Sequence, residues 1–200
     1  MCGTSEAGER KTRLRTHLLH TRRMMTAAER DTASAAVLRA VRDLPEVAPP
    51  GPVAAYVSMG TEPGTRELIE SLRRAGTRVL LPVLLDDNDL DWAEYEGAAT
   101  LRRTERGLFE PTGPLLGPQA VTRARAVLLP GLAVDTHGVR LGRGGGSYDR
   151  VLRRLREAAV NPLLMVLLYA HEVVESVPQE PHDHPVNVAV TPEGVHRFTR

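Results

Sequence analysis

Short apolar runs alternate with helix-like segments along this sequence, and that alternation most limits what the chain can fold into. Strands that are apolar on both faces must be covered on both sides, which is typical of parallel sheets. The runs expected to be strands are 53–59, 78–85, 90–95, 126–129, 163–170 and 186–191. The segments expected to be helices are 9–25, 27–41, 65–75 and 147–158. We therefore expect an α/β fold with a mostly parallel sheet flanked by helices.

Local signals mark the ends of two of these helices. Thr26 and Glu29 have the spacing of a capping box, which predicts that a helix begins at Ala27. The proline-rich segment 45–52 follows that helix, and Gly76 follows the expected helix 65–75.

The 200 residues are enough for one sizeable core and give no sign of a second, so we expect a single domain over 1–200 with residues 1–8 disordered. No apolar run approaches the roughly 20 residues that cross a bilayer. The first residues lack the apolar core of a signal peptide, and Cys2 is the only cysteine. These features predict a cytoplasmic protein without an internal disulfide.

Net charge is +1, so the overall field gives no reason to expect a nucleic acid or a membrane as partner. We expect a monomer or a weak homodimer. Among the 26 basic residues Lys11 is the only lysine. A lysine ammonium meets a phosphate as a compact point charge, whereas arginine offers a planar fork, so this lone lysine is a candidate phosphate ligand.

The segment RLGRGGGSYDR at 140–150 combines four glycines with three arginines. It precedes an expected helix in a region where α/β sheets bind ligands. Consecutive glycines let backbone N–H groups approach a ligand, and the helix N-terminus favours an anion. Arginine neutralises phosphoryl charge, and Asp149 is an oxygen ligand suited to Mg²⁺. The segment therefore predicts a phosphate-binding loop.

Two established phosphate-binding motifs do not fit this loop. A Walker A motif ends in Gly-Lys-Ser/Thr, but Ser147 follows Gly146 directly. A dinucleotide-binding fingerprint that starts at Gly142 requires a third glycine at position 147.

The stretch LLPGLAVDTHGVRLGRGGGSYDRVLRRL at 128–155 resembles the 5-formyltetrahydrofolate cyclo-ligase (5,10-methenyltetrahydrofolate synthetase) family. That family carries a PGLAFD-like segment followed by R-x-G-x-G-x-G-Y-Y-D-R. Individually weaker similarities follow the family order along nearly the whole chain: Lys11 with Arg15; Tyr56, Met59, Glu62 and Thr65; Leu81-Pro82; Glu110-Pro111; and VP-x-E-x-HD at 177–183.

The resemblance implies a Rossmann-like three-layer fold of cyclo-ligase/NagB-like type. It also implies the ATP- and Mg²⁺-dependent closure of 5-formyltetrahydrofolate to 5,10-methenyltetrahydrofolate, with ADP and phosphate released. Reduced folate and ATP are then the expected partners. The alternative is a diverged relative that binds reduced folate or nucleotide without turnover. A phosphosugar isomerase-like protein is a more distant alternative, because a fold does not fix its chemistry.

Roles implied by the resemblance fall on particular residues of this sequence. The implied ATP-binding residues are Lys11, Arg15, Arg140, Leu141, Gly142, Arg143, Gly144, Gly145, Gly146, Ser147 and Tyr148. The implied folate-binding residues are Met59, Glu62, Arg143, Gly144, Gly145, Gly146 and Ser147. Lys11 and Arg143 are the implied catalytic residues, and Asp149 is the implied Mg²⁺ ligand.

Three positions depart from the family pattern. Ser147 replaces an aromatic residue that can stack on folate. Asn187 stands where a second acidic residue is often found, which puts a second metal contact in doubt, and Gly64 replaces a carboxylate or similar polar residue.

Three other features have weaker interpretations. His182-Asp183-His184 has no regular metal-ligand spacing and is better explained as a surface loop. Asp135-Thr136-His137 with Ser147 could suggest a hydrolase, but no Gly-x-Ser-x-Gly elbow accompanies them. Trp92 is most simply a packed strand residue, with a folate-pocket residue as the alternative.

Overall fold

The computed structural model describes residues 6–180 and 183–198. Within these ranges, seven strands form one sheet in the order β12-β11-β9-β6-β1-β2-β3. They are β1 (Val53–Ala54), β2 (Val79–Leu84), β3 (Leu90–Glu94), β6 (Ala126–Pro130), β9 (Leu163–Leu167), β11 (Val188–Thr191) and β12 (Gly194–Arg197). The inner strands are parallel, while β3 and β12 pair antiparallel at the two edges. The expected mostly parallel sheet is confirmed.

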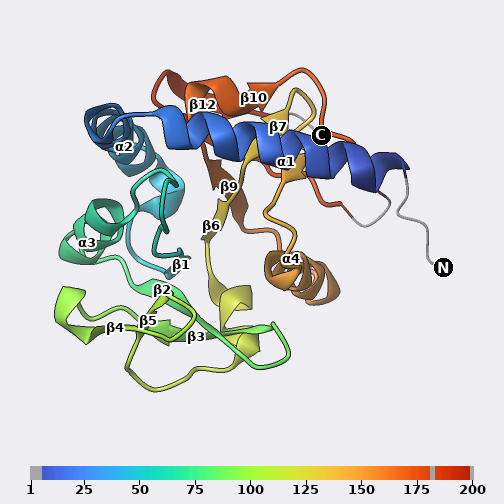
Figure 1. Cartoon of the computed structure of the whole chain (residues 1–200). Coiled ribbons are helices and arrows are strands. Elements are labelled where there is room, and N and C mark those ends of the chain that lie inside the picture. The colour runs from blue at the N-terminus through green and yellow to red at the C-terminus, as the bar shows by residue number, and fades with distance from the viewer. Residues whose placement is uncertain (1–5, 181–182, 199–200) are drawn as a thin grey trace.

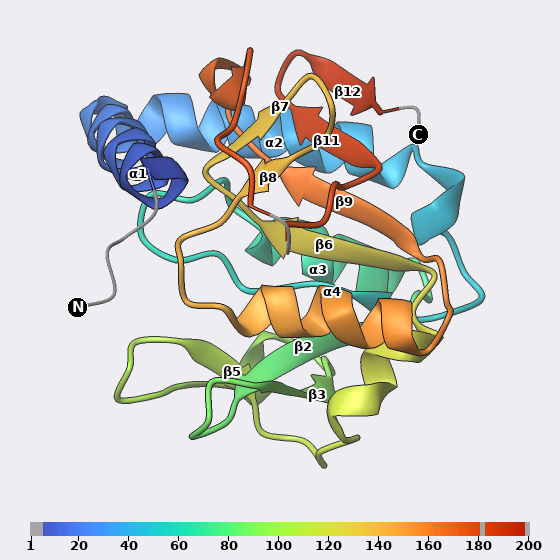
Figure 2. The same ribbon diagram turned by 90° about the vertical axis from the view of Figure 1, so that its right-hand side faces the viewer.

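Helices cover both faces of this sheet (Figures 1 and 2). Helices α2 (Ala27–Arg42) and α3 (Arg66–Arg74) pack on one face, and α4 (Ser147–Glu157) packs on the other. Because successive side chains of a strand point to opposite faces, Leu128 joins the first core and Leu129 the second. The result is the three-layer arrangement expected from the sequence.

Helix α1 (Glu6–Met24) lies across the top of the molecule in Figure 1 and packs on a small second sheet. That sheet has the order β10-β7-β8, with bounds Val173–Val174, Ala133–Asp135 and Arg140–Leu141. Since α1 begins at Glu6, residues 6–8 are helical rather than disordered as expected. Residues 1–5 lie outside the described ranges.

The remaining elements connect these layers. Strands β4 (Leu101–Arg103) and β5 (Phe109–Pro111) form a two-stranded antiparallel hairpin beside β2. The short 3₁₀ helices are η1 (Pro45–Val47), η2 (Ala98–Thr100), η3 (Pro118–Arg123) and η4 (Ala170–Glu172). No helix in the described part of the chain combines the length and apolar character needed to span a membrane.

Two strands end three or more residues before their expected apolar runs do. The run 53–59 pairs only over Val53–Ala54, and the run 163–170 ends its ladder at Leu167. In both cases the chain leaves the sheet at the carboxyl end of a parallel strand. The apolar side chains beyond that point line or support a binding site, and their backbone no longer forms part of a strand.

A fully buried ion pair connects α1 to η4, which comes much later in the sequence. Arg22 donates from Nε to Glu172 Oε1 at 2.6 Å and from Nη2 to Glu172 Oε2 at 2.8 Å. The same Nη2 donates to the Gly131 carbonyl at 2.6 Å, just past β6. Glu172 Oε2 also accepts the Tyr169 N–H at 2.9 Å. Both charged side chains have 0% exposure, so α1, β6 and η4 are held by one buried polar network.

Arg22→Ala should lower the free energy of unfolding by about 3–5 kcal/mol, because it leaves the Glu172 carboxylate buried without its cation. Arg23→Ala, on the exposed side of α1, should change it by less than about 0.5 kcal/mol. Urea unfolding of both variants checks this. Equal stability of the two variants would show that the buried pair does not hold α1 in place.

Candidate functional site

The glycine-rich loop connects β8 directly to the N-terminus of α4. Gly144 has φ +92° and Gly146 has φ +76°, and residues that carry a Cβ rarely adopt positive φ values of this size. Gly146 is the residue before the first turn of α4, and no side chain caps that turn. The free N–H groups of the first turn, together with the helix dipole, therefore form a site suited to an anion.

A cavity of about 310 Å³ opens against this loop. It lies at the carboxyl ends of β1, β2 and β6, the edge where open α/β sheets bind ligands. Among the residues singled out from the sequence, it is lined by Met59, Glu62, Arg140, Gly142, Arg143, Gly144, Gly145, Gly146, Ser147, Tyr148 and Asp149. Leu141, Lys11 and Arg15 are not among its lining residues.

Most of the apolar wall of this cavity was not singled out from the sequence. It is formed by Tyr56, Val57, Pro82, Leu84, Leu90, Leu108, Phe109 and Pro130, and the Glu110 carboxylate lies beside it. Residues 108–110 come from the β4–β5 hairpin, where no strong local motif marks them. Tyr56, Pro82, Glu110 and Pro130 occur in the family-like segments, so the resemblance contained a signal for these four.

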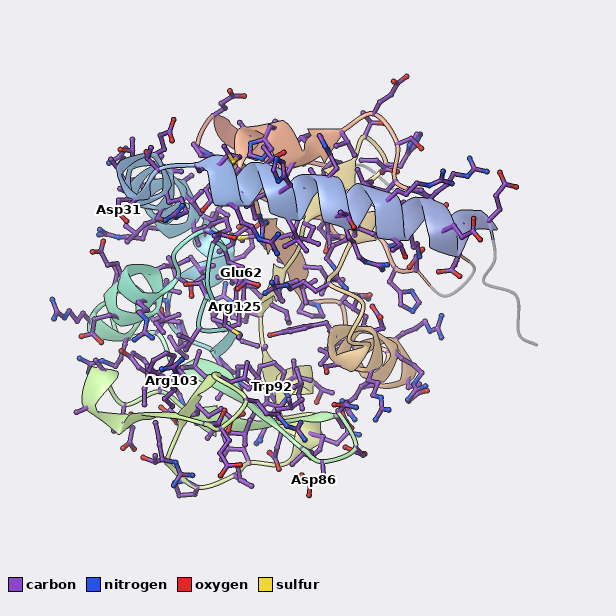
Figure 3. All side chains as sticks on the ribbon, in the orientation of Figure 1. Asp31, Glu62, Asp86, Trp92, Arg103 and Arg125 are labelled. Carbon is purple, nitrogen blue, oxygen red and sulfur yellow. The ribbon has the colours of Figure 1, made fainter. Side chains whose placement is uncertain are left out.

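Glu62 connects two sides of the cavity. Its Oε1 accepts from Arg143 Nη1 at 3.1 Å, and its Oε2 accepts the Met59 N–H at 2.8 Å. The Glu62 side chain is 8% exposed, whereas that of Arg143 is 49% exposed. Tyr169 donates its hydroxyl proton to the Thr61 carbonyl at 3.1 Å, which fixes the segment that carries Glu62. Figure 3 shows Glu62 below α1 and well separated from Trp92.

Arg140 holds the opposite side of the loop. It donates from Nη1 to the Pro130 carbonyl at 2.9 Å and from Nη2 to Asp149 Oδ1 at 3.2 Å. Burial lowers the pKa of Arg140, and the Asp149 carboxylate partly opposes that effect. Because the arginine pKa is ordinarily above about 12, the guanidinium keeps its charge at neutral pH.

Asp149 is the one candidate metal ligand in the cavity wall that the sequence singled out. Its side chain is 50% exposed on the first turn of α4, so an oxygen is open to a ligand. The described residues contain no group of three or more His, Cys, Asp or Glu side chains able to hold a metal together. Mg²⁺ commonly binds through one or two carboxylates plus substrate phosphates, and a single carboxylate beside an anion-binding loop fits that pattern.

Two basic residues of α1 lie behind the loop. Arg15 donates from Nε to the Gly142 carbonyl at 2.9 Å. One turn earlier, Lys11 Nζ donates to Glu180 Oε2 at 2.7 Å and to Asp183 Oδ2 at 2.6 Å. Burial lowers the pKa of Lys11, but the hydrogen bonds with Asp183 and Glu180 outweigh it, so the pKa is raised. Lys11 is thus a buried, charged group paired with two carboxylates, and its contact with a phosphate stays a prediction.

Tyr148 is the aromatic neighbour of the family departure at Ser147. Both residues line the cavity. Burial, with a smaller contribution from Glu62, raises the pKa of Tyr148, so its hydroxyl keeps its proton at neutral pH. Trp92 is fully buried in the core under α4 and does not line the cavity, which supports its interpretation as a packed strand residue.

The structure places the other two departures away from the cavity. The Asn187 side-chain oxygen accepts the Leu164 N–H at 2.8 Å near the amino end of β9. The cavity lies at the carboxyl ends of the strands, so Asn187 has a structural role at the other end of the sheet. Gly64 donates its N–H to Ser34 Oγ at 2.7 Å, and a Cβ at Gly64 would lie 2.9 Å from that oxygen. A larger side chain at this position would require Ser34 to move.

The remaining weak candidates also have structural explanations. Asp135 Oδ1 accepts the N–H groups of His137 and Val139, which closes a turn outside the cavity. Asp183 is bonded to Lys11, and His182 lies outside the described residues. Neither a hydrolase triad nor a histidine-aspartate metal site is built from the described members of these two motifs.

Gly144→Ala should destabilise the fold by about 1–2 kcal/mol, since a Cβ is strained at positive φ. The neighbouring Gly145 lacks a positive φ, and a Cβ added there would meet open space, so Gly145→Ala should be close to neutral. Chemical denaturation of the two variants tests this. A loss of equal size in both would mean that backbone strain at Gly144 is not the cause.

The chain is similar over nearly its full length to proteins of one family. A model described as the 5-formyltetrahydrofolate cyclo-ligase family matches residues 7–192. The 5-formyltetrahydrofolate cyclo-ligase of Mycolicibacterium smegmatis is 37% identical, with 92% of this chain and 94% of the relative covered. That of Escherichia coli K12 is 32% identical, with 87% and 96% covered.

Solved structures agree with the sequence comparison. The NMR structure of Aquifex aeolicus 5,10-methenyltetrahydrofolate synthetase has a TM-score of 0.80 and 30% identity, and covers 95% of this chain and 93% of its own. A 5,10-methenyltetrahydrofolate synthetase from Mycoplasma pneumoniae shares the fold, with a TM-score of 0.70, 17% identity, and 91% and 98% covered. The glycine-rich loop, the Met59–Glu62 segment and these matches lead to one assignment: the chain belongs to the 5-formyltetrahydrofolate cyclo-ligase family.

Proposed function

We propose that this protein closes 5-formyltetrahydrofolate to 5,10-methenyltetrahydrofolate, using ATP and Mg²⁺ and releasing ADP and phosphate. Membership of the cyclo-ligase family supports the reaction. The observation that carries the site assignment is the cavity in which the Glu62 carboxylate, Arg143 and the glycine-rich loop converge.

The reaction needs phosphoryl transfer because a formamide oxygen is a poor leaving group. In the proposed sequence the formyl oxygen attacks the γ-phosphate of ATP, which releases ADP and leaves a phosphorylated imidate-like intermediate. N10 of the folate then attacks the formyl carbon, and the C–O bond breaks as phosphate leaves. Protein groups in such a reaction act mainly by positioning the reactants and neutralising charge.

The residues of the cavity can be assigned to these tasks. The N–H groups of residues 144–148, at the start of α4, bind phosphate oxygens, and Arg15 supports the loop through the Gly142 carbonyl. Arg143 faces the transferring phosphoryl group, since its side chain is half exposed in the cavity and forms an ion pair with Glu62 in the cavity wall. Met59 and Glu62 hold the folate, with Glu62 accepting hydrogen bonds from the pterin edge.

Asp149 is the residue that would hold Mg²⁺, which when bound neutralises charge on the phosphates. Its position on the first turn of α4 puts it next to the proposed phosphate site. Arg140 bonds only one of its oxygens, Oδ1, among the described contacts, and this orients the carboxylate.

Incubation with 5-formyltetrahydrofolate, ATP and Mg²⁺ should produce the near-ultraviolet absorption band of the methenyl product, with one ADP and one phosphate released per product. The assay follows both signals in parallel. Tight folate binding without ADP release, under conditions where the Escherichia coli relative turns over, would identify a non-catalytic folate-binding protein instead.

Asp149→Asn weakens the proposed Mg²⁺ contact, and Lys11→Ala removes the proposed contact with an ATP phosphate. Each should reduce turnover by about tenfold or more, since loss of an interaction with a charged group costs about 1.5–3 kcal/mol. Added Mg²⁺ should partly restore Asp149→Asn, whose defect is in metal affinity, and should leave Lys11→Ala unchanged. Steady-state rates over a Mg²⁺ titration make the comparison.

Two controls accompany that pair. Asp86→Asn removes an exposed carboxylate from the β2–β3 turn and should leave the rate unchanged. Because Lys11→Ala also leaves Glu180 and Asp183 without their cation, its thermal midpoint is measured alongside the rate. Normal kinetics in both site variants would mean that the nucleotide binds elsewhere.

A further inference from the structure

Tyr56 is a cavity residue to which the proposed reaction has not yet given a role. It follows β1 by two residues, and its carbonyl accepts from the Thr65 hydroxyl at 2.6 Å, which fixes its backbone. The residue is only 4% exposed, yet it lines the cavity beside Glu62 and Tyr148. Its ring is therefore part of the packed wall rather than a mobile surface group.

The hydroxyl of Tyr56 is buried without a hydrogen-bond partner. In residues 6–180 and 183–198, the buried side-chain polar atoms without a partner are Arg22 Nη1, Glu46 Oε2, Tyr56 OH, Trp92 Nε1 and Arg140 Nε. Of these five residues, Tyr56 and Arg140 line the cavity. Buried polar groups are nearly always paired, and leaving one unpaired is costly. A phenylalanine would fill the same space without that cost, so the hydroxyl calls for a partner. Arg22 also acts electrostatically on Tyr56, but its side chain does not line the cavity, whereas Tyr56 does, and a ligand there can supply an acceptor.

The surroundings make this hydroxyl a hydrogen-bond donor. Burial, then the nearby Glu62 carboxylate, raises the pKa of Tyr56 well above its ordinary value, so the phenol keeps its proton. The Glu62 carboxylate accepts hydrogen bonds from Arg143 and from the Met59 N–H, and its oxygens are acceptors for a ligand as well. The wall therefore presents an acceptor and a donor to the same part of a ligand.

A pterin ring has a complementary edge. Its amino group and ring N–H are donors, and the adjacent ring carbonyl is an acceptor. We propose that the Tyr56 hydroxyl donates a hydrogen bond to the pterin carbonyl while Glu62 accepts from the neighbouring N–H groups, which makes Tyr56 a specificity-determining residue. This inference rests on the proposed function, because it takes reduced folate as the occupant of the cavity.

Tyr56→Phe removes only the hydroxyl. Its dissociation constant for 5-formyltetrahydrofolate, measured by calorimetry without ATP, should rise about 5- to 10-fold, the effect of one net hydrogen bond. The KM for ATP should stay unchanged. The thermal midpoint of the free protein should stay level or rise, because an unpaired buried group has been removed.

Tyr95→Phe is the matched control. The Tyr95 hydroxyl donates to Glu70 Oε2 at 3.1 Å, and Tyr95 does not line the cavity. This variant should lose thermal stability and keep its folate affinity, the reverse of the result expected for Tyr56→Phe.

The outcomes separate this inference from the function it rests on. If wild-type protein fails to bind 5-formyltetrahydrofolate, the proposed function falls and the role of Tyr56 falls with it. If wild-type protein binds and Tyr56→Phe binds equally well, only the role of Tyr56 is overturned. A lower thermal midpoint in Tyr56→Phe with unchanged affinity would also overturn it, because the hydroxyl would then be paired within the protein.

Discussion

Two arginines donate hydrogen bonds to backbone carbonyls at the carboxyl end of β6, and the position of the whole site depends on these contacts. The carbonyls of Pro130 and Gly131 lie where the chain leaves the sheet, and they accept from Arg140 and Arg22. Arg22 comes from α1 and is paired with Glu172, while Arg140 comes from β8 and is paired with Asp149. A polar atom buried in this way is stable only with a partner, so these pairs connect the end of the central strand to α1, η4 and α4.

The cavity divides its tasks between two kinds of surface. An apolar wall from the ends of the strands and the β4–β5 hairpin suits a flat ring, while the glycine-rich loop and the start of α4 suit anions. Glu62 and Arg143 meet where these surfaces join. A junction of this kind would bring a ring and a phosphate side by side, as the proposed reaction between a folate and a nucleotide requires.

The sheet and the loop were predictable from sequence because their signals are local. Apolar runs of strand length marked every parallel strand of the seven-stranded sheet, and the capping box at Thr26 marked the start of α2. The parallel pair of β7 and β10 in the small sheet was not among the expected strands. The glycines and arginines of segment 140–150 predicted a ligand-binding loop, and the family resemblance supplied Met59 and Glu62. Tyr56 was recognised as part of a motif, but a sequence pattern cannot reveal an unpaired hydroxyl.

What sequence reasoning missed depends on long-range pairing. Lys11 was interpreted as a phosphate ligand, and nothing in its local sequence indicated Glu180 and Asp183, 169 and 172 residues away, as hydrogen-bond partners. Likewise, nothing near Arg22 distinguishes it from the exposed Arg23; only Glu172 makes it a core residue. Residues 108–110 reach the cavity only because the hairpin folds beside β2.

The sequence positions of the ion-pair partners of Lys11 and Arg22 also have a consequence for folding during protein synthesis. Helix α1 is synthesised 150 to 172 residues before the carboxylates that neutralise its two buried cations, which belong to Glu172, Glu180 and Asp183. A ribosome synthesises a chain from its N-terminus at about 5–20 residues per second, so α1 must wait roughly 8 to 34 seconds for these partners to be made. During that wait Lys11 and Arg22 lack these carboxylates. The ion pairs that hold α1 in place therefore form only after Glu172, Glu180 and Asp183 have been synthesised.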